Sequence, residues 1–507
     1  MRHASTVAGS HTPRQSHARR CRRDGPRAIE EKPDRCPSRA RDGAVGNKHD
    51  FWEPVMQRRK TLLVGSGPAN LALLTCLKEW GSSVLESLEV LERRDSAEWH
   101  PGIAFEDSML QVSLFKDLAF LRNPASPFTF FSFLRDKELL YHFIHTNNLY
   151  PSRKLFSDYL VWVSRFFANK ISFGKEAVAV RFREKPPGTQ TLVVTTRDVS
   201  SGDVSEIEAD DVVVSLGHEP YIPEELAVDS SRVVHSNFFL SHANEGMINA
   251  NARVAVVGSG QSAGEIVKFL LQHREVSEVI VVGRRRLFEQ TDDNPFVNDF
   301  YTYPHSLKFA ELPLEDRKRF LSDTRNTNFS TVTKEVLKSI YDLRFEDQAC
   351  GRDRLRLFPY TEITAAKRLE NGLRLDLRGI GGRPDSTTLE IDLLVCATGF
   401  SNRRHLSFIQ LLQPRMEDAD VVVDESFEVG LDRMPESCRT GPRPRVFLVN
   451  HSFGLRGPTE HTLGGLAERA AVVAKALQDG HVLQPAQGRP ETLPAAWPTR
   501  NSRVETK

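Results

Sequence analysis

Residues 256–265 read Val-Val-Gly-Ser-Gly-Gln-Ser-Ala-Gly-Glu, and a similar glycine-rich turn, Gly-Ser-Gly-Pro-Ala-Asn, occupies residues 65–70. Each turn follows a short apolar run of β-branched residues and opens a helical pattern, which is the context that a dinucleotide-binding fingerprint requires. One such turn is a weak signal. Two of them in one chain predict two cofactors held face to face, and this arrangement favours a flavin that a nicotinamide reduces.

Length and composition set wide bounds on the function. A chain of 507 residues can bury a large core and form more than one domain. The net charge of +1, with 27% charged residues, gives no support for nucleic-acid binding. We find no run of about 18 apolar residues, so no membrane span is predicted. The six cysteines form no Cys-x-x-Cys pair, which predicts a reduced, cytoplasmic protein and argues against a dithiol-using flavin reductase.

The first turn has the features of an FAD site. Gly65 permits a tight bend, and Gly67 lets the backbone approach a pyrophosphate at the start of a helix. Glu92 ends the next apolar run, where its carboxylate can accept hydrogen bonds from ribose hydroxyls. The alternative is an ordinary strand, turn and helix with incidental glycines and a solvated glutamate.

The second turn ends differently. No acid closes the apolar run at residues 279–282, and Arg284 stands there instead. A guanidinium at this place suits the 2′-phosphate of NADPH, so NADPH is the expected reductant rather than NADH. The alternative is a surface cluster of arginines in a loop. No metal site is predicted.

The predicted fold class is α/β, with two Rossmann-like dinucleotide-binding domains (FAD and NADPH) and a small, mostly helical substrate-binding insertion. The first fifty residues carry ten arginines and two lysines against six acidic residues, with almost no apolar run, so they cannot offset their ordering entropy. The predicted segments are a disordered basic extension at 1–55, the first part of the FAD-binding domain at 56–228, an NADPH-binding domain at 229–390 with the insertion at about 291–345, the C-terminal FAD-binding and substrate part at 391–482, and a disordered tail at 483–507.

A long loop carries a more specific signal. It reads Trp-His-Pro-Gly at 99–102, Gln-Val-Ser-Leu-Phe-Lys-Asp-Leu at 111–118 and Leu-Arg-Asn-Pro-Ala-Ser-Pro-Phe at 121–128. Asp-Asp-Asn-Pro-Phe-Val-Asn at 292–298 and Asn-Thr-Asn-Phe-Ser at 326–330 follow in order. This set resembles the signature of the L-lysine/L-ornithine N-hydroxylating flavin monooxygenases of siderophore biosynthesis, over roughly residues 60–480.

The resemblance implies cofactor-binding positions beyond the two turns. The stretch from Glu92 to His100 would lie along FAD, with Gln111 near the isoalloxazine ring. The FAD-binding residues that it implies are Gly65, Gly67, Pro68, Asn70, Glu92, Trp99, His100, Gln111, Val178, Thr462 and Leu463. The NADPH-binding residues that it implies are Ser259, Gly260, Gln261, Ser262, Arg284, Asn298, Tyr301, Asn328 and Ser330.

Three residues are expected to bind the substrate. By resemblance, Lys116 grips the carboxylate of an amino acid, a task that suits a flexible cationic point charge. Asn298 and Asn328 match the asparagines that position the substrate, and neutral amides avoid favouring the charged form of the amine. Otherwise Lys116 is a surface lysine, and each asparagine is a turn former. No catalytic residue is named with certainty.

The last motif departs from the family. A Leu-Leu-Ser is expected near the flavin and substrate, but the serine falls on Gly464 or Gly465. This predicts that one hydroxyl contact is lost and space is gained, which leaves the identity of the amine open. Glu460 and His461, just before it, are either local substitutes for the hydroxyl or solvated side chains.

The predicted activity is FAD- and NADPH-dependent hydroxylation of the terminal amine of L-ornithine or L-lysine by O₂, through a flavin hydroperoxide. The alternatives are an N-hydroxylase of a diamine or another primary amine and, more remotely, a nucleotide-binding protein without turnover. A ketone- or sulfide-oxidising flavin monooxygenase is disfavoured, because residues 231–239 lack the Phe-x-Gly of that class. The resemblance also implies a homotetramer.

Overall fold

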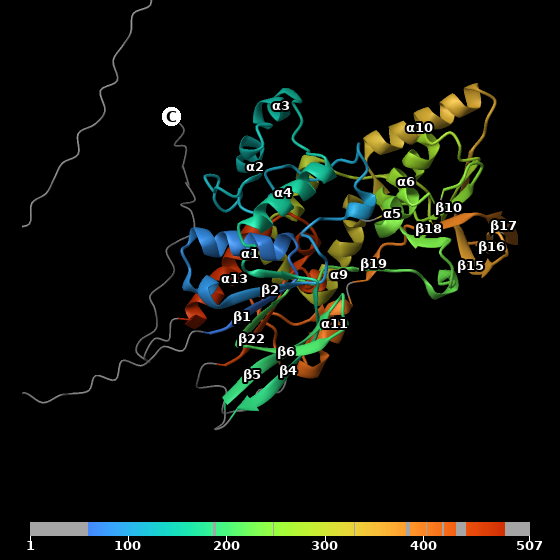
Figure 1. The fold of residues 1–507 in the computed structure, drawn as a ribbon. Coiled ribbons are helices and arrows are strands. Elements are labelled where there is room, and N and C mark those ends of the chain that lie inside the picture. The colour runs from blue at the N-terminus through green and yellow to red at the C-terminus, as the bar shows by residue number, and fades with distance from the viewer. Residues whose placement is uncertain are drawn as a thin grey trace, which may run out of the picture. The chain divides into compact units, whose positions relative to one another are not determined.

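The computed structural model describes residues 59–185, 189–246, 248–328, 330–381, 386–401, 403–417, 420–431 and 443–481 (Figure 1). The predicted disordered segments at 1–55 and 483–507 lie outside the described residues. None of the helices in the described part of the chain is long and apolar enough to cross a membrane.

The first glycine-rich turn belongs to a five-stranded parallel sheet with the order β22-β7-β1-β2-β3. Its strands are short and apolar because helices or a second sheet cover both faces, so every side chain of β1 and β7 is buried. The strands are β1 (Thr61–Val64), β2 (Leu88–Glu92), β3 (Ile171–Phe173), β7 (Asp211–Val214) and β22 (Arg445–Leu448).

The second turn belongs to another five-stranded parallel sheet, ordered β14-β11-β10-β18-β9. The strand that precedes the turn, β10, lies in the centre exactly as β1 does in the first sheet, so the two Rossmann-like units repeat one plan. The strands are β9 (Val233–His235), β10 (Arg253–Val257), β11 (Glu278–Gly283), β14 (Leu355–Pro359) and β18 (Leu393–Cys396).

Each unit also contains a three-stranded antiparallel sheet, which covers one face of its parallel sheet. In the first unit β4 and β5 pair as an antiparallel hairpin. The strands are β4 (Lys175–Lys185), β5 (Thr189–Asp198) and β6 (Val204–Ala209) in the first unit, and β15 (Thr361–Arg368), β16 (Leu373–Gly379) and β17 (Ser386–Ile391) in the second.

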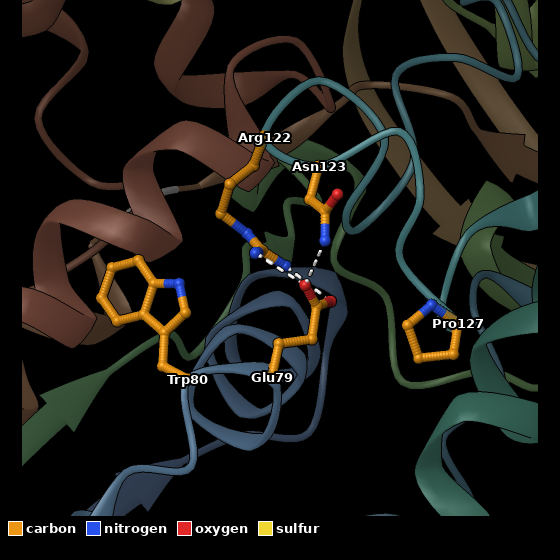
Figure 2. Close-up of a pocket in the computed structure, with 5 residues that line it drawn as sticks. All are labelled: Glu79, Trp80, Arg122, Asn123 and Pro127. Atoms are coloured by element: carbon orange, nitrogen blue, oxygen red, sulfur yellow. Dashed lines mark hydrogen bonds and ion pairs between the residues drawn. The ribbon is translucent and has the colours of Figure 1, made fainter.

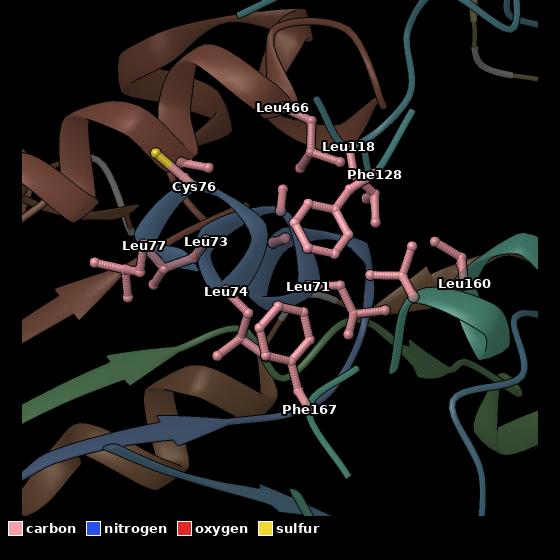
Figure 3. Packing of buried hydrophobic residues seen from close by; sticks show 14 of the residues in the cluster. Leu71, Leu73, Leu74, Cys76, Leu77, Leu118, Phe128, Leu160, Phe167 and Leu466 are labelled. Carbon is pink, nitrogen blue, oxygen red and sulfur yellow. The ribbon is translucent and has the colours of Figure 1, made fainter. Parts of the chain in front are cut away.

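Helices cover the other face of each parallel sheet. In the first unit α1, α4 and α13 pack there, and Figure 3 shows the leucines of α1 against Leu118, Phe128, Leu160 and Leu466. In the second unit α5, α6 and α10 do so. These helices are α1 (Pro68–Glu79), α4 (Arg153–Arg165), α5 (Phe239–Asn244), α6 (Gln261–Gln272), α10 (Lys334–Ala349) and α13 (Leu466–His481).

The remaining helices are short. The longer helix α4 begins after Ser152, which caps it by accepting a hydrogen bond from the Leu155 N–H. The predicted insertion is helical and ends with α10. These helices are α2 (Phe130–Asp136), α3 (Leu140–His145), α7 (Pro295–Asn298), α8 (Tyr303–Ala310), α9 (Leu314–Asp323), α11 (Arg404–Ile409) and α12 (Phe453–Arg456).

The loop after β2 links the two units. Ile103 and Phe105 leave the first unit and are buried in the apolar core around α6. Gly102 passes so close to the second unit that a Cβ there would lie 1.8 Å from the Asn237 carbonyl oxygen. The loop therefore fixes the two nucleotide-binding units to each other at the point where the cofactors are expected to meet.

Candidate active site

The two glycine-rich turns have matching geometry. Gly65 and Gly258 have φ of +93° and +129°, and a Cβ on them would lie 2.5 and 2.3 Å from the carbonyl oxygens of Ser215 and Ala397. Those carbonyls end β7 and β18, the strands on the far side of each turn from β2 and β11. Only glycine fits such a contact at positive φ. Both turns therefore lie where open α/β sheets bind ligands, at the carboxyl ends of the central strands.

The helix that follows each turn begins at a glycine with no side-chain cap. Gly67 precedes α1, in which Pro68 is the first residue, and Gly260 precedes α6. A Cβ on Gly67 would meet no atom within 4 Å. The Asn70 amide bonds the Val64 and Gly65 carbonyls at 3.0 and 2.7 Å and so braces the first turn. Uncapped helix N–H groups beside open space are suited to binding a phosphate.

Glu92 lies beside the first turn, as predicted. Its carboxylate accepts hydrogen bonds from the Ser66 N–H at 2.8 Å and the Arg94 N–H at 3.0 Å. Burial tends to raise the pKa of Glu92, but Arg94 and these two N–H groups outweigh burial and lower it. The carboxylate therefore stays ionised and can accept hydrogen bonds from ribose hydroxyls.

The other predicted FAD residues of the first unit lie in the loop after β2 and in β4. The Trp99 ring packs edge-on against Phe156, and His100 Nδ1 lies 3.2 Å from Asn237 Oδ1 of the second unit. Gln111 is exposed in the long loop. Val178 is 37% exposed and lies at a β-bulge in β4. A bulge changes the direction in which a side chain points from its strand.

Two carboxylates hold the signature loop in place, one buried and one partly buried. Asp117 accepts hydrogen bonds from the backbone N–H groups of residues 119, 120 and 130. Glu79, at the end of α1, accepts hydrogen bonds from Arg122 Nη1 and Nη2 at 2.9 and 2.8 Å. It also accepts hydrogen bonds from Asn123 Nδ2 at 2.9 Å and from Ser126 Oγ at 2.5 Å. Figure 2 shows Arg122 and Asn123 converging on Glu79. Together with Trp80 and Pro127, these residues line a surface pocket of about 600 Å³. These side chains hydrogen-bond one another, although Arg122 Nε has no partner among the described residues, so the pocket mainly serves the loop's structure.

Lys116 precedes Asp117 in that loop. Its side chain is half-buried, and no hydrogen bond or ion pair joins its ammonium group to any residue that the structure describes. Burial lowers the pKa of Lys116. A partly desolvated cation without an acidic partner is ready to receive an anionic group from a ligand.

The second turn places its predicted residues along the start of α6. Ser259 and Gly260 precede the helix, and Gln261 and Ser262 are its first two residues. Arg284 is exposed directly after β11, and its guanidinium has no hydrogen-bond or ion-pair partner among the described residues. In contrast, Arg286 forms an ion pair with Glu289, with 3.5 Å between Nε and Oε1.

The insertion brings its predicted residues into two adjoining segments. Asn298 ends α7 and is exposed, with its side-chain amide donating to the Asp293 carbonyl at 3.1 Å. Asn328 follows a short 3-10 turn and is half-buried. The Tyr301 hydroxyl bonds the Thr327 hydroxyl and so joins the segments. In the part of the chain that the structure describes, no hydrogen bond links either asparagine to the lysine of the signature loop.

Ser330 lies close to the second glycine-rich turn. It has a positive φ of 60°, and its Cα would lie 3.5 Å from a Cβ on Gly260. This contact places the end of the second asparagine-bearing segment over the start of α6, where the resemblance implies NADPH.

The predicted gain of space at Gly464 is wrong. A Cβ on Gly464 would lie 2.3 Å from the Tyr301 carbonyl oxygen, and one on Gly465 would lie 2.9 Å from Thr459 Cγ2. The backbone of the insertion fills the place that a serine would take. Thr462 and Leu463, predicted near FAD, therefore lie next to Tyr301, predicted near NADPH.

Glu460 and His461 are not solvated side chains. Glu460 is 1% exposed and accepts a hydrogen bond from the Ser452 N–H at 3.2 Å. Behind it Arg469, also 1% exposed, donates to the carbonyls of residues 459, 462 and 464 and to Asn450 Oδ1. Sequence reasoning missed this arginine, although a cation early in the largely apolar run at 466–477 is a signal. It holds the turn that carries the predicted FAD residues 462 and 463.

Four histidines gather beside this turn. The rings of His461 and His218 lie 4.7 Å apart, and the rings of His451 and His405 lie 4.3 Å apart. Burial lowers the pKa of His461 to about 3 and that of His451 well below its ordinary 6.5. Burial also lowers the pKa of His100 to about 4, although the contact with Asn237 raises it.

These histidines predict acid sensitivity. Between pH 6.5 and 4 the unfolded chain binds protons that the folded chain does not, so the free energy of unfolding falls as the pH falls. The slope is about 1.4 kcal/mol per pH unit for each such histidine. Urea unfolding at several pH values measures it. His461→Gln should flatten the slope by about one proton, whereas replacing the exposed His142 should not. Equal slopes in wild type and His461→Gln would contradict this assignment.

Comparison with known proteins decides the family. The family model described as L-lysine 6-monooxygenase/L-ornithine 5-monooxygenase matches residues 60–402. An L-ornithine N(5)-oxygenase of Arthrobotrys oligospora is 31% identical over 431 residues, which cover 82% of this chain and 87% of that protein. The chain belongs to this family. The predicted family is confirmed, and with it the predicted enzyme class, an N-hydroxylating monooxygenase.

Solved structures agree with the family and the fold. An ornithine N-hydroxylase of Kutzneria sp. 744, with reduced FAD, NADP⁺ and L-ornithine, has a TM-score of 0.76 and 29% identity, covering 83% of this chain and 99% of that one. An L-lysine 6-monooxygenase of Pseudomonas syringae has a TM-score of 0.71 and 25% identity, covering 83% and 99%. The predicted α/β fold with two Rossmann-like domains is confirmed.

Proposed function

We propose that this monooxygenase uses FAD and NADPH to hydroxylate the terminal amine of L-ornithine with O₂, for a siderophore or another hydroxamate product. Lys116 is the observation that favours an amino acid over a diamine as the substrate. Its half-buried ammonium group has no partner among the described residues. A diamine would leave this cation without a counter-charge, whereas the carboxylate of an amino acid supplies one. The relative of Arthrobotrys oligospora and the Kutzneria structure, both named for ornithine, favour ornithine over lysine.

The residues at both turns fit their cofactors. At the first turn, the N–H groups at the start of α1 would hold the FAD pyrophosphate, and Glu92 would accept its ribose hydroxyls. At the second turn, the start of α6 would hold the NADPH pyrophosphate, and Arg284 would bind the 2′-phosphate. When both are bound, NADPH supplies hydride to the flavin, which then activates O₂.

The protein's part is to bind, orient and exclude water. Lys116 would anchor the carboxylate, and the side-chain amides of Asn298 and Asn328 would position the amine. These amides carry no charge, so they do not stabilise the ammonium form that cannot react. The segments at 300–306 and 456–465 contact each other, with Thr459 Oγ1 donating to the Phe300 carbonyl at 3.2 Å. This contact supports a closed site, since it would shield the reacting atoms from water.

A product assay tests the proposal. Purified protein with FAD and NADPH would be supplied with ornithine, lysine, putrescine, cadaverine or histamine, and the N-hydroxylated product would be quantified. We expect ornithine to give the highest kcat/KM and a product yield close to the NADPH consumed. Preference for putrescine would instead support the diamine alternative, and a protein that takes up no FAD would refute the proposal. The tetramer and the cytoplasmic location stay predictions, and light scattering tests the first.

Arg284 gives a test of the reductant. Arg284→Ala should raise the KM for NADPH by about 10- to 100-fold, because it removes a charge-assisted contact to the 2′-phosphate. The KM for NADH should stay unchanged. Steady-state oxidation of both nucleotides measures this, and Arg286→Ala is the control because that arginine pairs with Glu289. An equal rise for NADPH and NADH would show that Arg284 does not read the 2′-phosphate.

A further inference from the structure

A buried ion pair joins the two nucleotide-binding units. Arg153 is the first residue of α4 in the first unit, and Glu265 lies in α6, the helix that the second turn opens. Arg153 Nη1 and Nη2 donate to Glu265 Oε2 and Oε1 at 2.8 and 3.0 Å. Their side chains are 9% and 5% exposed. The pair is thus a bidentate, charge-assisted contact shielded from water.

The pair extends into the site on both sides. Arg153 also donates to the Ile103 carbonyl, in the loop that links the two units. Glu265 Oε1 accepts a hydrogen bond from Gln261 Nε2 at 2.9 Å, and Gln261 Oε1 accepts one from the Thr333 N–H at 2.9 Å. Gln261 begins α6, and Thr333 directly follows β13 (Thr331–Val332). One network therefore connects the linking loop, the start of α6 and the segment that carries Asn328.

Stability alone does not account for this pair. Glu265 is 5% exposed and lies on the same side of α6 as Gln261 and Lys268, opposite the apolar side of the helix. Replacing a buried ion pair by well-packed apolar residues is often neutral or stabilising, because two charges must lose their hydration. What a bidentate pair adds over an apolar contact is a defined distance and orientation.

We propose that Arg153 and Glu265 are positioning residues for hydride transfer. They set the position of the start of α6, and of the NADPH bound there, relative to the flavin in the first unit. In that step the nicotinamide C4–H bond breaks, its two electrons and the hydrogen pass to the oxidised flavin, and NADP⁺ remains. The inference rests on the proposed function, because it requires FAD at the first turn and NADPH at the second.

A second ion pair between the same two regions provides a matched control. Lys268 Nζ, also on α6, lies 2.5 Å from Asp107 Oδ2 in the linking loop. The Asp107 side chain is 53% exposed, and exposed ion pairs contribute little free energy to the structure. Asp107→Asn therefore removes an ion pair at the same junction without touching the buried network.

The experiment measures reduction of the bound FAD by NADPH in anaerobic stopped flow. Glu265→Gln should slow it by about 10- to 100-fold, since small displacements of reacting groups have effects of that size. Arg153→Lys, which keeps the charge but loses the bidentate contact, should fall between this variant and wild type. Asp107→Asn should stay within about twofold of wild type. Reduction of the same FAD by dithionite should be equal in all four proteins.

Hydrogen exchange of the cofactor-free proteins gives a readout apart from activity. Amides at 258–265 and 330–336 should exchange faster in Glu265→Gln than in wild type or Asp107→Asn, while those of β1 and β7 should not change. The proposal is overturned if Glu265→Gln is reduced by NADPH as fast as wild type, or if it loses FAD or slows equally with dithionite. A wild-type flavin that NADPH does not reduce would instead refute the proposed function.

Discussion

Replacing Lys116 by alanine should raise the KM for L-ornithine by about 100-fold, which corresponds to losing about 3 kcal/mol from a partly desolvated contact between an ammonium group and a carboxylate. The oxidation of NADPH without amine should stay nearly unchanged, because Lys116 lies in the signature loop and not at either turn. Burial already lowers the pKa of this lysine. Binding of a substrate carboxylate would therefore stabilise the charged ammonium form more than it would in water. Initial rates of product formation over a range of ornithine concentrations measure the effect.

Two comparisons separate lost recognition from a damaged loop. Lys116→Met keeps the apolar bulk and should behave like Lys116→Ala, whereas Lys154→Met removes an exposed lysine that pairs with Asp158 on α4 and should leave the KM unchanged. The KM for putrescine, which has no carboxylate, should be the same in all these proteins. An unchanged ornithine KM in Lys116→Met would remove this lysine from the substrate site.

The parts of the fold that the sequence predicts are local ones. A short β-branched run, a Gly-x-Gly turn and an apolar helix lie within about twenty residues of each other, so the pattern is complete before any tertiary contact forms. Gly65 and Gly258 were predicted on this basis. The structure adds the reason for them, which is the approach of a carbonyl oxygen at the end of β7 or β18.

The contacts that position the site are distant in the chain, and the sequence does not predict them. Arg153 and Glu265 are separated by 112 positions, and Glu79 and Arg122 by 43. Glu265 lies on the polar side of α6, beside Gln261 and Lys268, so the sequence does not show that it is buried or which residue it pairs with. Gly464 was misread for a related reason. A missing side chain indicates free space only if no backbone approaches, and here the insertion does.

Restoring the family's serine at Gly464 should therefore damage the enzyme instead of repairing it. The new Cβ would lie 2.3 Å from the Tyr301 carbonyl oxygen, and relieving an overlap with backbone costs about 1–3 kcal/mol. The shift would separate the insertion from the turn that carries Thr462 and Leu463. We expect a lower melting temperature and about tenfold less N-hydroxylated product per NADPH oxidised, because small displacements at a reacting centre have large effects.

Gly202→Ser supplies the control for Gly464→Ser. Gly202 has a φ of +78° and no atom within 4 Å of a Cβ, so its replacement strains the backbone by about 1 kcal/mol without any overlap. This variant should lose some stability and keep its full product yield. Gly464→Ser should lose both, because its effect arises between the two regions predicted to hold the cofactors. If Gly464→Ser instead kept the wild-type melting temperature and yield, the segment at Tyr301 would be free to move away, and a hydroxyl at position 464 would be compatible with the site after all.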